Sequence, residues 1–174
     1  MPFDALTVSA LQEEFNRTLA NGRIEKIHQP QKDLVNITIY HPFPRRELRA
    51  LLSTHPRFAR GHLLSDKLDN PLQPSAFCML LRKYLGGGRI LSIDQPSWER
   101  ILIFRIENLD STHGLVTFSL VFEAMGRFSN LILVDHRGVI IDALKRFPEG
   151  SKGARVIFPG QEYQPPPAPT RFQP

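Results

Sequence analysis

The feature that most constrains the fold is a series of short apolar segments in the second half of the chain. They are rich in phenylalanine and β-branched residues, which favour strands. They cover residues 89–93, 101–106, 116–122, 131–134 and 139–143. Residues 135–138 read Asp-His-Arg-Gly, a composition suited to a hairpin turn between the last two segments. Because helical segments do not separate these strands, the pattern disfavours a doubly wound parallel sheet and predicts mostly antiparallel pairing.

The first half of the chain adds two amphipathic helices and three further strands. Apolar residues of the first helix recur every three or four positions, namely Val8, Leu11, Phe15 and Leu19. We expect Asp4 or Thr7 to cap its start, and Asn21 with Gly22 to end it. A second helix is predicted over residues 74–85, before three glycines at 86–88, and strands over 23–28, 34–40 and 48–53. The predicted fold is α+β, a mostly antiparallel β-sandwich or barrel flanked by two or three helices.

The length of 174 residues suits one domain with one core. A run of prolines between residues 164 and 169 cannot form a core, so we divide the chain into a domain over 1–158 and a Pro-rich linker over 159–174. The linker is expected to lead to downstream domains.

Cys78 is the only cysteine, which excludes an internal disulfide, and its apolar surroundings predict a small buried side chain.

The charge balance favours a nucleic-acid partner. Lysine and arginine total 22 against 17 acidic residues, which gives a net charge of +5. Arginine predominates among the cations, and its planar guanidinium binds phosphate with two hydrogen bonds and stacks on bases. A solvated basic surface without a partner is the alternative.

No basic segment followed by an apolar run opens the chain, and no apolar run approaches the ~20 residues that span a bilayer. We therefore expect a cytoplasmic protein with no membrane partner.

Catalytic and metal-binding patterns are weak. The six histidines lack ligand spacing, so we expect neither a metal nor a cofactor. No nucleophile-elbow motif accompanies the serines. Pro2, if exposed by removal of Met1, could form a Schiff base as in one class of DNA glycosylase, but those enzymes have glutamate next and here Phe3 follows. We expect no enzymatic activity. Four acidic residues could still converge in space: Asp94, Glu99, Glu123 and Asp142.

Three basic groups are candidate RNA contacts, although each is equally compatible with a solvated turn. The first, at residues 55–62, alternates aromatic and basic side chains and contains Arg57 and Arg60. The second is the segment Trp98-Glu99-Arg100, before a strand. The third contains Lys145, Arg146, Lys152 and Arg155. We add to these Arg82 and Lys83 of the second helix, and Arg127, as possible RNA-binding residues.

The order of several motifs resembles the NFACT family of ribosome quality-control proteins. Phe3-Asp4 precedes the first helix, and the segments 22–30 (GRIEKIHQP) and 77–85 (FCMLLRKYL) follow. Later come the Glu99–Arg100 pair, residues 123–130 (EAMGRFSN), which resemble the family's E-x-M-G-(R/K)-x-S-N segment, and residues 159–163 (PGQEY) before the prolines. The resemblance covers nearly the whole chain.

This resemblance implies a function and a set of site residues. Full-length members bind large ribosomal subunits that carry an obstructed nascent chain, recruit tRNA, and support untemplated C-terminal addition of alanine in bacteria. By resemblance, Asp4, Glu99 and Arg100 are the tRNA-binding residues, and the domain is similar in fold to the N-terminal domain of formamidopyrimidine-type DNA glycosylases. Position 99 is glutamate where the family commonly has aspartate. The family has also been described as fibronectin- or fibrinogen-binding surface proteins, and this role is the alternative, together with a glycosylase-like nucleic-acid-processing domain.

Overall fold

The computed structural model describes residues 3–64, 68–97, 99–150 and 155–167. Within these ranges, one nine-stranded sheet is accompanied by two α-helices and a short 3-10 helix, η1 (Gly126–Phe128). The order of strands in the sheet is β4-β3-β2-β1-β5-β6-β7-β8-β9, and every neighbouring pair is antiparallel. The strands are β1 (Arg23–Gln31), β2 (Leu34–Pro42), β3 (Arg45–Ser53), β4 (Arg60–Leu64), β5 (Arg89–Asp94), β6 (Ile101–Asp110), β7 (Gly114–Glu123), β8 (Asn130–Val134) and β9 (Ile140–Ala143). The predicted α+β, mostly antiparallel fold is confirmed.

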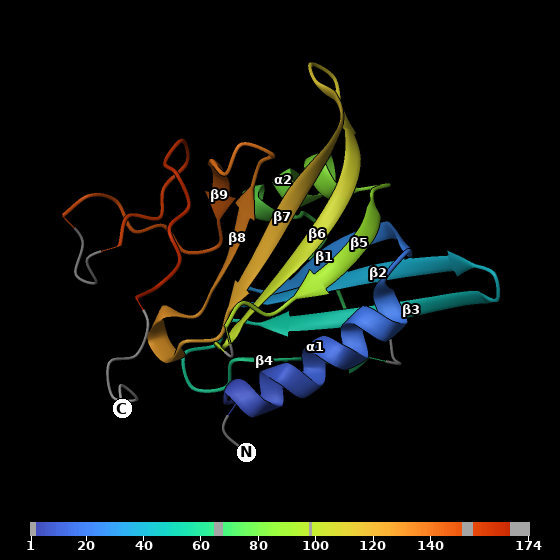
Figure 1. Ribbon diagram of the computed structural model, residues 1–174, viewed down its shortest axis with the longest axis horizontal. Coiled ribbons are helices and arrows are strands. Elements are labelled where there is room, and N and C mark those ends of the chain that lie inside the picture. The colour runs from blue at the N-terminus through green and yellow to red at the C-terminus, as the bar shows by residue number, and fades with distance from the viewer. Residues whose placement is uncertain (1–2, 65–67, 98, 151–154, 168–174) are drawn as a thin grey trace.

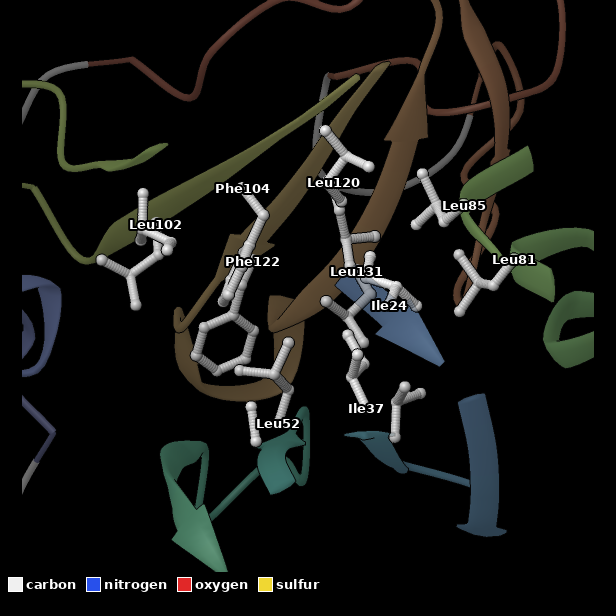
Figure 2. Close-up of a cluster of buried hydrophobic side chains, with 14 of the residues drawn as sticks. Ile24, Ile37, Leu52, Leu81, Leu85, Leu102, Phe104, Leu120, Phe122 and Leu131 are labelled. Carbon is white, nitrogen blue, oxygen red and sulfur yellow. The ribbon is translucent and has the colours of Figure 1, made fainter. Parts of the chain in front are cut away.

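The sheet is folded on itself between β1 and β5. The ladder between these two strands contains a single residue pair, Arg23 with Arg89, whereas the neighbouring ladders are long. The β1–β4 half and the β5–β9 half can therefore turn their inner faces toward each other (Figure 1). Side chains from both halves meet in one apolar cluster (Figure 2). It includes Ile24, Ile37 and Leu52 from the first half and Phe104, Leu120, Phe122 and Leu131 from the second.

Helix α1 (Ala5–Leu19) closes one side of this core. Its buried residues are those of the predicted apolar face: Val8, Leu11, Phe15 and Leu19. Its N-cap is Asp4, one of the two predicted candidates. Two polar side chains hold the helix on β5: Gln12 Nε2 donates to the carbonyl of Ile93 at 2.7 Å, and the Ile93 amide donates to Asn16 Oδ1 at 2.9 Å.

Helix α2 (Ala76–Leu85) begins at the N-cap Ser75, whose hydroxyl accepts a hydrogen bond from the Cys78 amide. Cys78 is buried, as expected, and burial raises the pKa of its thiol. Arg82 does not simply point away from the sheet as the pattern predicts, because its Nε donates to the carbonyl of Ile27 in β1 at 2.7 Å. In the described part of the chain, neither α-helix is long and apolar enough to span a membrane.

Three observations go beyond the predicted elements. Strand β4 was not predicted, because its residues 60–64 (RGHLL) were interpreted as part of a basic loop. Strand β3 begins at Arg45, three residues before the predicted start. Pairing also continues past residue 158: the Ile140 amide donates to the carbonyl of Gln161, and the Tyr163 amide donates to that of Gly138. Residues 159–163 thus pack on the β8–β9 region, and a linker role for the residues after them stays a prediction.

Candidate nucleic-acid interface

Asp4 lies exposed at the start of α1. Its Oδ1 accepts hydrogen bonds from the Thr7 amide at 2.8 Å and from the Thr7 hydroxyl at 2.9 Å. These bonds stabilise the ionised form and lower the pKa of the carboxyl. The Asp4 side chain is therefore a carboxylate at neutral pH, fixed in direction by the helix that it caps.

Gln95 connects the start of α1 to the Glu99–Arg100 pair. Its Nε2 donates to the carbonyl of Ala5 at 3.1 Å and to the carbonyl of Glu99 at 2.7 Å. The loop that leads to β6 is also tightened by a bond from the Glu99 amide to the carbonyl of Pro96 at 3.1 Å. Ala5, the residue after Asp4, is far from Glu99 in sequence, yet the Gln95 side chain bonds to the backbones of both. Trp98, predicted as part of this group, lies outside the described residues.

Arg100 connects this loop to the segment after β7. Its carbonyl accepts a hydrogen bond from the Ala124 amide at 2.9 Å, and its side chain is exposed. Arg100 forms no ion pair with a described residue. Two residues past Ala124, Gly126 opens η1 with a positive φ of 58°. Arg127 follows, with its guanidinium 4.8 Å from the centre of the Phe128 ring.

The 54–58 loop lies beside η1. A Cβ placed on Gly126 would lie 3.9 Å from the carbonyl oxygen of Pro56, so the backbone that carries Arg127 passes close to the backbone that carries Arg57. Lys145 reaches the same loop from the residues after β9, because its Nζ donates to the carbonyl of Thr54 at 2.9 Å. Partial burial lowers the pKa of Lys145.

These contacts form a continuous series, which we call the basic rim: Asp4, Arg57, Glu99, Arg100, Arg127 and Lys145. It follows one end of the sheet, where the start of α1, the beginning of β6 and η1 lie together (Figure 1). Arg57, Arg100 and Arg127 are exposed and form no ion pair with any described residue. Unneutralised guanidinium groups in a row are suited to binding successive phosphates.

The other predicted RNA-binding residues are placed differently. Arg60 opens β4 opposite Ser53. Arg82 binds the carbonyl of Ile27, and Lys83 lies over the Tyr84 ring, so both belong to α2 and not to the basic rim. Arg146 makes two 2.9 Å hydrogen bonds to the carboxylate of Asp142, which neutralises its charge.

The four acidic residues that could have converged do not form one cluster. Glu123 is fully buried and is bound by Arg155 at 2.5 Å and by the Tyr163 hydroxyl at 2.7 Å. Asp94 pairs with Arg105, and Asp142 pairs with Arg146. Each of these three carboxylates therefore has its own arginine partner. In the described residues, no group of histidine, cysteine and carboxylate side chains is placed to hold a metal ion. Pro2 and Lys152 lie outside the described part of the chain.

Two positioning residues were not predicted from the sequence. Gln95 bridges the two parts of the expected tRNA site, and a lone glutamine in a loop carries no pattern that would reveal it. Asn130 is fully buried and exchanges two 2.9 Å hydrogen bonds with the backbone of Lys145. The only sequence signal for Asn130 is its place at the end of the 123–130 segment, and that place does not reveal its contact with Lys145.

Comparison with known proteins identifies the family of this chain. The family model for NFACT N-terminal and middle domains matches residues 4–174. The chain belongs to the NFACT family. The Rqc2 homolog RqcH of Bacillus subtilis is 39% identical over 176 residues, which cover all of this chain and 30% of that protein. The human ribosome quality control complex subunit NEMF is 24% identical over 143 residues, 82% of this chain and 12% of that protein. These relatives identify the family as one of ribosome quality control.

Solved structures of NFACT relatives have the same fold. The N-terminal domain of the fibronectin-binding protein PavA from Streptococcus pneumoniae has a TM-score of 0.90 and 36% identity, over 96% of this chain and 63% of that one. The N-terminal part of the fibronectin/fibrinogen-binding protein of Streptococcus suis has a TM-score of 0.91 and 36% identity, over 97% and 62%. The present NFACT chain spans about 30% of the length of the Bacillus subtilis relative. The likeness to glycosylases stays a prediction.

Proposed function

We propose that this NFACT chain is the tRNA- and ribosome-binding module of a cytoplasmic ribosome quality-control factor. The full protein would bind large ribosomal subunits that hold an obstructed nascent chain. It would recruit tRNA there for untemplated addition of alanine to the C-terminus of that chain. The basic rim would face the tRNA, and the downstream domains of the same protein would complete the contact with the subunit.

One observation carries this proposal: Gln95 holds the backbones of Ala5 and Glu99 together, beside Asp4 and Arg100. The three residues that the family resemblance implies for tRNA binding are thus linked through the backbone, although Asp4 is far from the other two in sequence. In the proposal, Arg100 binds a tRNA phosphate or base. Asp4 and Glu99 accept hydrogen bonds from nucleotides or orient Arg100.

The direct test measures tRNA binding by the full-length protein over a series of salt concentrations, for the wild type and Arg100→Ala. We expect the variant to lose about 1–3 kcal/mol of binding free energy. We also expect the slope of log affinity against log salt to fall by about 0.7–0.9, one phosphate contact. Arg137→Ala is the matched control, because Arg137 is paired with Asp135 in the turn before β9. Equal binding by wild type and Arg100→Ala would remove the tRNA site from this residue.

A second function is favoured by the names of the similar structures, two of which are described as fibronectin- or fibrinogen-binding. Under this alternative, the protein acts at the cell surface on a matrix protein. Protease treatment of intact cells separates the two functions: a surface protein is degraded, whereas a quality-control factor is protected and cosediments with large ribosomal subunits.

We further propose that the domain acts by binding, without glycosylase or lyase chemistry. The separate ion pairs of Asp94, Glu123 and Asp142 support this, since these three carboxylates do not converge on one site. Borohydride trapping on abasic DNA is the test. A covalent adduct that disappears when Pro2 is replaced would contradict this part of the proposal.

A further inference from the structure

The hairpin of β2 and β3 presents a phenylalanine at its tip. The ladder between the two strands runs without interruption to the pair Pro42–Arg45, so the turn consists of Phe43 and Pro44 alone. The residue Phe43 is 93% exposed, against 63% for Phe58, the next most exposed phenylalanine among those described. The hairpin projects beyond the body of the molecule at the right of Figure 1. Phe43 therefore lies where a partner can reach both faces of its ring.

The end of β2 next to this turn is fixed to the core. The His41 ring is buried, and its Nε2 lies 2.8 Å from the carbonyl of Thr18 in α1. A Cβ placed on Gly22 would lie 3.0 Å from the same ring and 2.4 Å from Ile39 Cγ2, so glycine is required for β2 to pack there. The prolines at positions 42 and 44 restrict the backbone on both sides of Phe43. A rigid tip loses little conformational entropy on binding.

The tip carries positive charge that no described residue neutralises. Arg45 and Arg46 immediately follow the turn, are exposed, and form no ion pair in the described structure. Consecutive strand residues point to opposite faces, so the two guanidinium groups lie on either side of the hairpin. Glu47, the nearest acidic residue of β3, is already bound to Arg49 at 2.9 Å.

A second hairpin with an exposed apolar tip provides a contrast. Leu109 of β6 and Leu115 of β7 lie opposite each other and are 76% and 60% exposed. The neighbouring charged residue, Asp110, is acidic and is bound to His113. Residues 109–115 of this tip include no arginine or lysine, whereas the β2–β3 tip carries a fully accessible phenylalanine beside two arginines.

We propose that Phe43 stacks on an unpaired RNA base while Arg45 and Arg46 bind the phosphates on either side of it. A flat ring between two cations is the combination that binds single-stranded nucleic acid without regard to sequence. This contact rests on the proposed function, since it takes tRNA or ribosomal RNA as the partner. It lies on a hairpin away from the basic rim and would hold the domain to RNA at a second point.

Photo-crosslinking tests the class of partner. A benzophenone amino acid is placed at position 43 of the full-length protein, which is mixed with large ribosomal subunits and tRNA and then irradiated. We expect crosslinks to RNA, located as stops in reverse transcription at unpaired nucleotides. The same probe at position 115 is the control and should give no such stop. Crosslinks from position 43 to ribosomal protein alone, or none at all, would overturn the proposal.

Binding to the same subunits tests the stacking itself. Phe43→Ala should weaken binding about 5- to 150-fold, the range for loss of one stacked base, and Phe43→Trp should restore it. Leu115→Ala should bind like the wild type. If Phe43→Ala binds these subunits normally while Arg100→Ala loses tRNA affinity, the stacking contact is wrong and the proposed function stands. If Phe43→Ala binds the subunits weakly while Arg100→Ala binds tRNA like the wild type, the stacking contact stands and the tRNA site on the basic rim is wrong.

Discussion

At the N-terminus of α1, one carboxylate has both a structural and a proposed functional role. Asp4 Oδ1 accepts both hydrogen bonds from Thr7, and these bonds lower the pKa of the carboxyl. The two Thr7 bonds leave the other oxygen, Oδ2, of this exposed residue able to accept a hydrogen bond from a nucleotide. Loss of tRNA binding after replacement of Asp4 would therefore have two explanations, the missing charge and a frayed helix.

Two substitutions separate these explanations. Asp4→Ser keeps an N-cap oxygen but removes the charge, whereas Asp4→Ala removes both. We expect both variants of the full-length protein to bind tRNA more weakly, and only Asp4→Ala to lower the urea midpoint of the domain. Binding of tRNA by Asp4→Ser at the wild-type level would show that Asp4 acts through the helix and not through its charge.

The segment over residues 155–163 packs on the sheet through one buried carboxylate, that of Glu123. Glu123, at the end of β7, is fully buried and holds both Arg155 and Tyr163. Burial, together with the negative charge of Glu123, raises the pKa of the Tyr163 hydroxyl well above its ordinary value. The segment is thus fixed to the sheet by a network that requires Tyr163 to keep its proton.

This network predicts a loss of stability in alkali. The folded state keeps the Tyr163 proton above the ordinary tyrosine pKa of about 10, where the unfolded state releases it. Stability from this group is complete below that pH and decreases as pH rises, by up to about 1.4 kcal/mol per pH unit. Urea unfolding at pH 8 and pH 10.5 measures the decrease. Tyr163→Phe should be less stable at pH 8 but lose less on going to pH 10.5, and an equal loss in both proteins would contradict the assignment.

Across the whole molecule, arginines divide into paired and unpaired sets. Arg89, Arg105 and Arg137 each lie within 4.0 Å of a carboxylate, from Glu107, Asp94 and Asp135 respectively. The arginines of the basic rim have no such partner among the described residues. The excess positive charge of the chain, +5 in total, is therefore strongest where unpaired arginines lie, as on the basic rim. These arginines are scattered in the sequence.

Two triple variants with the same net charge test this division. Replacing Arg57, Arg100 and Arg127 by alanine should reduce the salt slope of tRNA binding by about 2–3, since each lost phosphate contact contributes about 0.7–0.9. Replacing Arg89, Arg105 and Arg137 should leave the slope nearly unchanged. The measurement is tRNA affinity of the full-length proteins between low and physiological salt. Similar slopes for the two variants would mean that net charge, and not the basic rim, governs binding.

The sequence by itself determined the elements. The 3.6-residue period of α1 and the alternation along β2 report which face of each segment is apolar, and caps and glycine stops act within a few residues. Eight of the nine strands and both α-helices follow from such local signals. Strand β4 did not, because it is short, half-buried and begins with arginine, so its pairing with β3 decides its conformation.

Only the tertiary structure decided which residues share a surface. The order of motifs implied a site of Asp4, Glu99 and Arg100. It did not imply that Gln95 links Ala5, beside Asp4, to Glu99, or that Arg57, Arg127 and Lys145 continue the basic rim. The same holds for Glu123, which is bound inside the molecule and does not join the other carboxylates. The approach of η1 and Lys145 to the 54–58 loop joins the two halves of the sheet, which face each other across the single β1–β5 pair. The periodicity of a segment predicts which of its residues are buried. The residues that they contact from other segments depend on the path of the whole chain.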